Sequence, residues 1–285
     1  MTNGNSQPVA RLDSVTAEFG ALRALDDVSF DIARGEILAV VGANGAGKST
    51  LLNALCGLIP LSGGRIELAN KRIDNIPTRR IARAGVTRSF QEPRLIEAEN
   101  VHSNVMLGMF MSTGYSVASQ LLAPWKVRRR EAGLVDRAEE ILVELGLGGR
   151  GEDMPDALSY GERKLVDIAR ALAGSPTILL LDEPSSGLDR AERAVVESLL
   201  LEWGKSGQRT VVMVEHHLDL VGSTAHRVLC LEAGAVMMIG QTDDVLTSEE
   251  FGRSLGGAVP DVVRTPTDSA GPIAGRPSTE SVGTK

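Results

Sequence analysis

The chain has 285 residues, 42% of them hydrophobic, which is enough for one large domain with a sizeable core. Acidic residues outnumber basic residues by 37 to 30, and the formal net charge is −7. This charge balance argues against a nucleic-acid-binding protein that is held by a broad basic surface.

Several short segments indicate in which kind of compartment the chain works and whether it enters a membrane itself. The two cysteines, Cys56 and Cys230, each lie in an apolar stretch without a C-x-x-C partner, which predicts small core residues and a reducing compartment. The three arginines at 128–130 predict a solvated helix face. The first eight residues are polar and no eighteen apolar residues run together, so we expect any membrane association to come through a partner.

The N-terminal part predicts an antiparallel pair of strands over residues 9–18 and 22–32, because apolar and polar residues alternate on both sides of Phe19 and Gly20. Phe19 falls in the predicted turn. Two interpretations of its ring stay open at this point: a half-buried turn aromatic, or a ring that stacks on a purine.

The stretch from Gly42 to Ser49 carries the strongest functional signal. It satisfies the pattern G-x-x-x-x-G-K-[ST], follows an apolar run at 37–41 and precedes a segment with helical spacing. Glycines let backbone N–H groups converge on phosphate oxygens, and a helix start adds free donors and a positive dipole end. Lys48 would pair with the β- and γ-phosphates, and the Ser49 hydroxyl would bind Mg²⁺. The stretch therefore predicts a nucleoside triphosphate site.

The middle of the chain predicts an inserted helical layer. A short strand at 65–68 and a β-branched segment at 86–90, which ends at Gln91, come first. A mostly helical stretch then extends to about residue 147. A further helix is predicted over 163–173, and Ser159 and Glu162 form a capping box before it, which is a complete structural explanation for those two residues.

Two apolar runs, at 177–181 and 210–214, predict buried parallel strands. The first ends in Asp182 and Glu183, and the second leads to His216. Open parallel sheets bind ligands at this end of their strands. A hairpin is predicted from strands at 228–231 and 236–239, and the proline-, glycine- and serine-rich composition after residue 256 predicts a disordered tail.

The order of these features resembles the ATP-binding cassette (ABC) ATPases over about residues 9 to 255. The motifs that carry the resemblance are Gly42–Ser49, Gln91, Leu158–Glu162, Ile178–Glu183, Ser186–Asp189 and His216. The resemblance implies an α/β fold of the P-loop NTPase type, with a mainly parallel sheet core, an N-terminal antiparallel β subdomain and an inserted helical subdomain. The ATPase domain is then expected over residues 8–257, the helical subdomain over about 92–165 and the tail over 258–285.

The resemblance also implies the roles of individual residues. Glu183 is expected to be the general base that orients the attacking water, His216 to contact the γ-phosphate, and Gln91 to sense Mg²⁺ and water. Asp182 is expected to hold Mg²⁺ through water, beside Ser49 and Gln91. Such groups supply the positioning and charge neutralisation that phosphoryl transfer requires. ATP and Mg²⁺ are the expected cofactors.

The remaining assignments concern the nucleotide and a second subunit. The residues expected to bind the nucleotide are Phe19, now favoured as a purine-stacking ring, and Gly42, Asn44, Gly45, Gly47, Lys48, Ser49 and Thr50. Ser159 and Gly161 are expected to close over the nucleotide of a second ATPase subunit, with Asp189 at the same junction. The sequence leaves open whether that subunit is identical or a paralogue.

Departures from the common signature Leu-Ser-Gly-Gly-Gln narrow the resemblance. Tyr160 and Glu162 stand at two of its positions, and the Ser-Tyr-Gly form resembles the ATPases of branched-chain amino-acid importers. This implies an ATP-hydrolysing subunit on the inner face of the cell membrane, bound to a separate permease and served indirectly by an external substrate-binding protein. Urea, short amides or aromatic acids stay open as cargo. We expect the permease to dock on the helical layer between Gln91 and residue 147.

Two other functions compete with an importer subunit. One is a soluble cassette ATPase that is not coupled to transport, for example in cofactor assembly or DNA maintenance. The other is a P-loop kinase or nucleotide-dependent switch, which would leave Ser159–Glu162 and His216 as structural features. Cassettes that act on DNA or ribosomes usually carry paired cassettes or long coiled coils, and neither occurs in this sequence, so no nucleic-acid partner is expected.

Overall fold

The structure of the chain, a computed structural model, describes residues 7–74, 76–113 and 124–254, and within them the side chains of all but residues 110–113 and 124–132. The predicted tail at 258–285 and the side chains of the arginines at 128–130 lie outside this description. Within the described part, no helix has both the length and the apolar character needed to cross a membrane.

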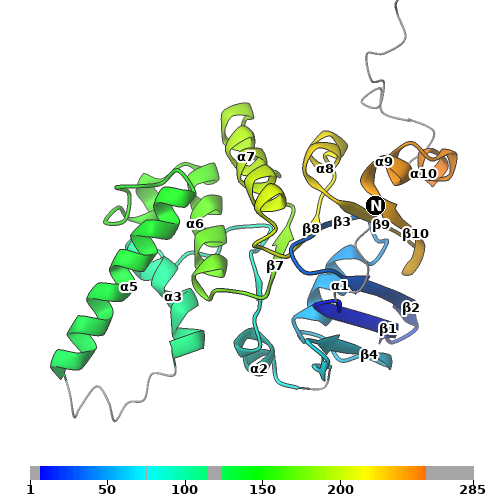
Figure 1. The fold of residues 1–285 in the computed structure, drawn as a ribbon, viewed down its shortest axis with the longest axis horizontal. Coiled ribbons are helices and arrows are strands. Elements are labelled where there is room, and N and C mark those ends of the chain that lie inside the picture. The colour runs from blue at the N-terminus through cyan, green and yellow to red at the C-terminus, as the bar shows by residue number, and fades with distance from the viewer. Residues whose placement is uncertain (1–6, 75, 114–123, 255–285) are drawn as a thin grey trace, which may run out of the picture.

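The core contains two sheets (Figure 1). The larger sheet has the strand order β10-β9-β3-β8-β7-β6, parallel from β9 to β6 and antiparallel between β10 and β9. Its strands are β3 (Ile37–Val41), β6 (Val86–Arg88), β7 (Ile178–Asp182), β8 (Val211–Val214), β9 (Arg227–Glu232) and β10 (Ala235–Gln241). The smaller, antiparallel sheet has the order β2-β1-β4-β5, with β1 (Ala10–Phe19), β2 (Leu22–Ile32), β4 (Gly63–Leu68) and β5 (Lys71–Arg72).

The helices fall into three groups along the chain. The helix α1 (Lys48–Leu55) follows β3, and α2 (Thr78–Arg83) precedes β6. The helical layer, drawn in green in Figure 1, contains α3 (Val101–Thr113), α5 (Pro124–Glu144), the short 3-10 helix η1 (Pro155–Ala157) and α6 (Tyr160–Ala173). The C-terminal helices are α7 (Arg190–Ser206), α8 (Leu218–Thr224), α9 (Thr242–Leu246) and α10 (Glu249–Ser254).

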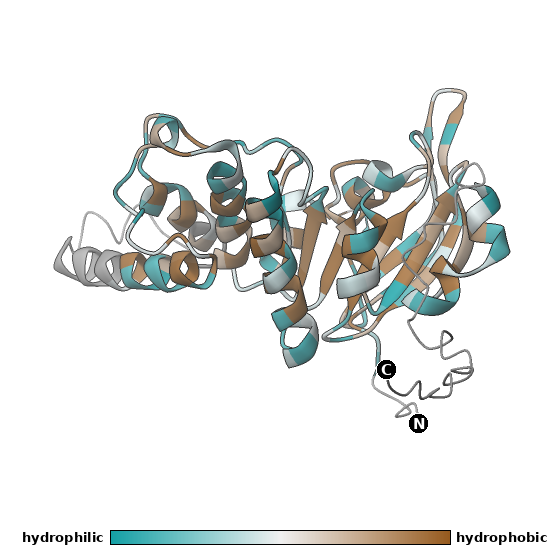
Figure 2. Cartoon of the chain, turned by 90° about the horizontal axis from the view of Figure 1, so that it is seen from above, coloured by the Kyte–Doolittle hydropathy of each residue, from teal (hydrophilic) through white to brown (hydrophobic). Residues whose placement is uncertain are grey.

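Both faces of the larger sheet are buried, as its continuous apolar strands predict. Along β3, Ile37 and Ala39 pack into the cluster on the side of the helical layer and α7, whereas Leu38 and Val40 pack into the cluster shared with the antiparallel sheet and α1. The strands at the centre of Figure 2 are accordingly hydrophobic. Cys56 and Cys230 are buried and unpaired, so their prediction as core residues is confirmed.

Most predicted elements form, with shifted ends. The antiparallel N-terminal pair is confirmed, but Phe19 is the last residue of β1 and not part of the turn. The helix predicted from Arg163 begins at Tyr160, because its capping box places the first helical residue directly after Ser159. The strand predicted over 86–90 ends at Arg88, and regular helix in the inserted layer begins only at Val101. The fold class, α/β with a P-loop core, is confirmed.

Candidate nucleotide-binding and catalytic site

The loop between β3 and α1 has the backbone that phosphate binding requires. Gly42 adopts a φ of 146°, and a Cβ built on it would lie 2.2 Å from the carbonyl oxygen of Leu231. Only glycine fits this position. Lys48 is the first residue of α1, and its Nζ donates to the carbonyls of Gly42 at 2.8 Å and Ala43 at 2.9 Å. Ser49 is exposed beside it.

The charge of Lys48 responds to two opposing influences. Burial lowers the pKa of Lys48, while the nearby carboxylates of Glu183 and Asp182 act to raise it. The phosphate loop and the end of β7 therefore form one electrostatic site, as expected at the carboxyl edge of a parallel sheet.

Three predicted catalytic residues meet at Glu183. Gln91 Nε2 donates to Glu183 Oε2 at 3.0 Å, and His216 Nε2 lies 3.0 Å from Glu183 Oε1. The three residues come from the segments that follow β6, β7 and β8, which are adjacent in the sheet. The structure thus brings together residues that are far apart in the sequence. The carboxylate of Glu183 is held on both oxygens.

The backbone of Glu183 is strained. Its φ is 48°, a left-handed value that is uncommon for a residue other than glycine and that often marks functional sites. Its N–H donates to Val214 O at 2.9 Å, and its carbonyl accepts from Lys164 Nζ at 2.5 Å. Lys164 is 2% exposed and also donates to Ser186 O. Sequence reasoning missed Lys164, although it lies on the buried face of α6, where a cation requires an internal partner.

Asp182 is fixed by a residue for which no site role was predicted. Arg88 donates to Asp182 Oδ2 at 2.5 Å and to Asn53 Oδ1, on α1, at 2.5 Å. Arg88 and Asp182 are both largely buried, with side chains 10% and 8% exposed. The guanidinium therefore connects the end of β7 to the helix that follows the phosphate loop.

The donor set at this site fits a hard divalent cation. Mg²⁺ prefers oxygen ligands and keeps several waters. The exposed hydroxyl of Ser49 and the exposed amide of Gln91 supply oxygens, and Asp182 uses Oδ2 for Arg88. Among the described residues, no hydrogen bond to Asp182 Oδ1 is present, so this oxygen is available to a metal-bound water.

A second buried carboxylate supports the end of β8. Burial acts to raise the pKa of Glu215, but the Ser185 hydroxyl and the backbone N–H groups of His217, Ser185 and His216 outweigh it, so the pKa lies below the ordinary value. The bond from His216 N to Glu215 Oε2 is 2.8 Å long. Glu215 thus sets the backbone direction at His216.

The predicted signature residues, Ser159, Gly161 and Asp189, lie at the starts of α6 and α7. Ser159 caps α6, and its Oγ accepts from Glu162 N while Glu162 Oε2 accepts from Ser159 N. Ser159 Oγ also donates to Glu192 Oε1 on α7, and Asp189 is the cap of α7. Ser159, Gly161 and Asp189 are therefore together, but α6 and α1 lie on opposite sides of β7 (Figure 1). Sequence reasoning missed Glu192.

Phe19 lies at the tip of the β1–β2 hairpin and is 49% exposed. The hairpin is close to the phosphate loop, because a Cβ on Gly47 would lie 2.6 Å from the carbonyl oxygen of Ala24. Asn44 and Gly45 are exposed on the same loop, and Thr50 is half-buried on α1. An exposed ring on a hairpin that contacts the phosphate loop is suited to stack on a base.

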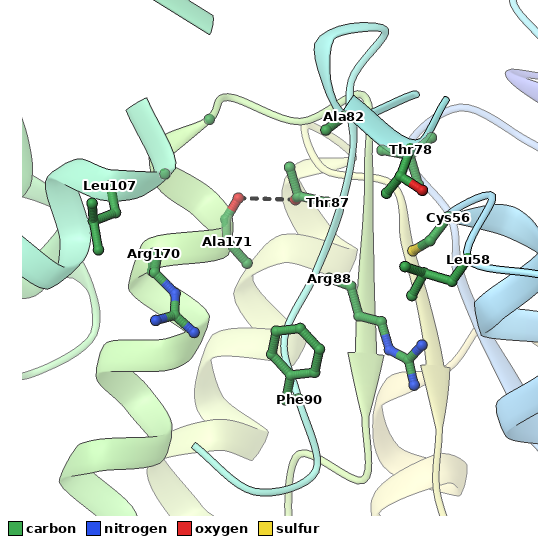
Figure 3. A pocket seen from close by; sticks show the side chains of 13 residues that line it. Cys56, Leu58, Thr78, Ala82, Thr87, Arg88, Phe90, Leu107, Arg170 and Ala171 are labelled. Carbon is green, nitrogen blue, oxygen red and sulfur yellow. Dashed lines mark hydrogen bonds between the residues drawn. The ribbon is translucent and has the colours of Figure 1, made fainter. Parts of the chain in front are cut away.

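An apolar groove lies where α2 and β6 meet the helices α3 and α6 of the helical layer. Its volume is about 290 Å³, and Figure 3 shows Leu58, Phe90 and Leu107 around it. Thr87 Oγ1 donates to Ala171 O at 2.9 Å along one wall. The charged residues that line the groove, Arg88 and Arg170, are both cationic.

This geometry agrees with comparisons to known proteins. The family model described as ABC transporter matches residues 25–186, which is more than half of the chain. The chain belongs to the ABC transporter family. As a member of this family it is an ATPase, in agreement with its phosphate loop and the carboxylate of Glu183.

Individual relatives of this ABC ATPase include importer subunits. It is 30% identical over 249 residues to the high-affinity branched-chain amino acid transport ATP-binding protein LivG of Salmonella typhimurium, covering 87% of this chain and 98% of that protein. It is 29% identical to the corresponding BraF of Pseudomonas aeruginosa over 84% of this chain and 94% of that protein. The methionine import ATP-binding protein MetN of Rhizobium etli is 33% identical, with 89% of this chain and 67% of that protein covered.

Solved structures of cassettes share the fold of this ABC ATPase. A nucleotide-free ATP-binding cassette from an ABC transporter superposes with a TM-score of 0.76 at 27% identity, covering 88% of this chain and all of that one. A dimeric cassette in a post-hydrolysis state, bound to ADP and phosphate, gives a TM-score of 0.69 at 26% identity over 82% of this chain and 98% of that one.

Proposed function

We propose that the chain is the ATP-hydrolysing subunit of an ABC importer for branched-chain or related amino acids. The observation that carries the ATPase part is the Glu183 carboxylate held between Gln91 and His216, at 3.0 Å from each. The cargo class is supported by the names of LivG and BraF, while MetN and a sulfate/thiosulfate import relative at 35% identity favour a broader range.

The nucleotide is bound by the phosphate loop and the β1–β2 hairpin. Phe19 stacks on the adenine, and the backbone of Gly42, Asn44, Gly45, Gly47, Lys48, Ser49 and Thr50 surrounds the phosphates. When ATP arrives, Lys48 Nζ exchanges the carbonyls of Gly42 and Ala43 for phosphate oxygens, so the ammonium group gains a full negative partner.

Ser49, Gln91 and Asp182 would hold Mg²⁺, Asp182 through water. The ion would neutralise charge on the phosphates during hydrolysis. Arg88 keeps Asp182 in place through Oδ2, so Oδ1 would be left to accept from a metal-bound water. The chain contributes a fixed carboxylate, which reduces the reorganisation needed as charge develops.

Hydrolysis depends on Glu183 as the general base. Its carboxylate orients a water toward the γ-phosphate, Gln91 holds the carboxylate from one side, and His216 contacts the γ-phosphate from the other. The strained backbone of Glu183 is fixed by hydrogen bonds to Val214 and Lys164. This fixed backbone restricts where the carboxylate can lie.

Two ATPase subunits complete the site. Ser159 and Gly161 of one subunit close over the nucleotide on the other, with Asp189 at the junction. In support, α6 and the helix α1 that follows the phosphate loop lie on opposite sides of β7 (Figure 1), and a dimeric cassette has the same fold. In this proposal the ATPase domain extends over residues 8–257 with the helical subdomain at about 92–165, and residues 258–285 lie outside the described part of the chain.

The permease binds the helical layer and the apolar groove beside it. A helix of the permease with apolar side chains would fill the volume between Leu58, Phe90 and Leu107. Phe90 precedes Gln91, so this docking surface adjoins the γ-phosphate site directly. Docking places the chain on the inner face of the membrane, and an external binding protein delivers the cargo to the permease.

Reconstitution tests this proposal. The chain is co-expressed with its membrane permease, and uptake of radiolabelled leucine is measured in proteoliposomes that contain ATP and the binding protein. We expect ATP-dependent uptake that competing isoleucine and valine suppress and that Lys48→Ala abolishes. Sulfate or an aromatic acid as the transported cargo would contradict the amino-acid assignment, and failure of the chain both to bind a permease and to support any ATP-dependent uptake would contradict the importer assignment.

A further inference from the structure

The signature serine is occupied by a carboxylate of its own chain. Ser159 Oγ donates to Glu192 Oε1 at 3.0 Å, and Glu192 Oε2 accepts from the backbone N–H of Asp189 at 3.1 Å. Asp189 Oδ1 in turn accepts from Glu192 N at 2.8 Å. Glu192 therefore bridges the starts of α6 and α7, and each of its two carboxylate oxygens has a partner.

The same carboxylate lies directly against Gly161. A Cβ built on Gly161 would be 2.1 Å from Glu192 Cδ and 2.3 Å from its Oε1. Gly161 is in the first turn of α6, where free N–H groups and the helix dipole favour a negative charge. An anion of this chain thus already lies at Ser159 and Gly161, where the proposed function places the partner's γ-phosphate.

The Glu192 carboxylate and the partner's γ-phosphate compete for the hydroxyl of Ser159. A serine hydroxyl has one proton to donate, so Ser159 cannot donate to Glu192 and to a phosphate oxygen together. Two negative groups in one place also repel each other, the more so as closure of two subunits removes water. The phosphate can accept a hydrogen bond from Ser159 only when Glu192 no longer accepts it.

We infer that Glu192 is a positioning residue that keeps Ser159 from the partner's nucleotide until ATP-driven closure displaces it. The inference rests on the proposed function, because it assumes that Ser159 and Gly161 act across the dimer. Glu192 keeps its bond to Asp189 N on release, so α7 stays capped. The contact raises the ATP concentration at which two chains close.

An ATP titration of dimer formation tests the inference. The full chain carries Glu183→Gln to prevent turnover, and the dimer fraction is measured by size-exclusion chromatography with light scattering. Adding Glu192→Gln keeps the shape and the capping bond but removes the charge. We expect the half-maximal ATP concentration to fall about three- to tenfold, as for loss of one competing charge-assisted hydrogen bond. Glu202→Gln, an exposed residue of α7, is the matched control and should cause no shift.

A double-mutant comparison shows whether Glu192 acts through Ser159. In a Ser159→Ala background, Glu192→Gln should change the logarithm of the half-maximal ATP concentration by at most half as much. An unchanged or raised ATP requirement with Glu192→Gln, at unchanged thermal stability, would overturn the inference and leave the proposed function intact. An undiminished effect in Ser159→Ala would overturn the positioning role. If Glu183→Gln alone forms no dimer with ATP, two copies of this chain do not close over nucleotide, and the inference fails because it requires that closure.

Discussion

At the scale of single residues, the site depends on buried charges that fix the groups expected to touch ATP. Lys164 holds the strained backbone of Glu183, Arg88 holds Asp182, and Glu215 holds the backbone of His216. Each is buried with specific partners, as buried ionised groups must be. Removal of Arg88 would leave the Asp182 charge uncompensated in a largely buried place, which is costly.

Glu215 gives this arrangement a pH dependence. Because the pKa of Glu215 is lowered in the folded chain, its contribution to stability is fully present above the ordinary value of 4.5 and is lost as the pH falls through the folded pKa. We expect Glu215→Gln to lower the free energy of unfolding at pH 7 by about 2–3 kcal/mol, because the amide cannot accept all the N–H bonds. Below about pH 4.5, the parent should lose stability more steeply than Glu215→Gln.

Urea denaturation over a series of pH values measures this difference. Glu202→Gln, which changes an exposed carboxylate, should follow the parent at every pH. Parallel curves for Glu215→Gln and the parent between neutral and acidic pH would contradict the role assigned to Glu215.

At the scale of elements, the helical layer is tied to the core by Glu144, the last residue of α5. Glu144 accepts from Trp203 Nε1 at 2.9 Å and from Arg209 at 2.7 and 2.8 Å. It therefore joins α5 to the last part of α7 and to the segment that leads into β8. The Arg209 guanidinium also lies 5.2 Å from the centroid of the Trp203 ring. These contacts fix where the layer sits beside the sheet.

We expect Glu144→Gln to lower the free energy of unfolding by about 1–2 kcal/mol, because it weakens a bidentate ion pair that is only partly exposed. The proposed permease-docking surface would move with the layer, so ATP-driven uptake should fall more than ATP binding. Glu140→Gln on the same helix is the control, since the exposed pair of Glu140 with Arg137 contributes less than about 1 kcal/mol. Equal stabilities of the two variants would show that Glu144 does not tie the layer to the core.

The elements were largely predictable from the sequence, and their ends were not. Apolar strands, the capping box at Ser159 and the phosphate loop are local patterns, and all formed as predicted. Phe19 was placed in a turn because alternation changes there, but pairing with Leu22 extends β1 by one residue. The carbonyls that Lys164 binds and the contact of Glu192 with Ser159 come from other elements, so no local pattern could have revealed them, whereas Asp189 and Glu192 form a capping box that the local spacing does contain.

At the scale of the whole molecule, the sheet order explains how the candidate site assembles. Strands β3, β8, β7 and β6 are parallel neighbours, so the phosphate loop, His216, Glu183 and Gln91 meet at one edge. The signature residues lie instead at the start of α6, on the other side of β7. A chain built this way carries two half-sites that its own fold keeps apart, and we propose that ATP joins them across two chains.

The most direct test of this account is the rate of ATP hydrolysis by Glu183→Gln at saturating Mg-ATP, measured beside its ATP affinity. We expect hydrolysis to fall by about two to four orders of magnitude, because the general base is lost while the shape of the site is kept. ATP affinity should stay within about twofold of the parent, since Lys48, Ser49 and Asp182 are unchanged. Lys48→Ala should instead lose the affinity itself. Hydrolysis by Glu183→Gln at the parent's rate would contradict the account.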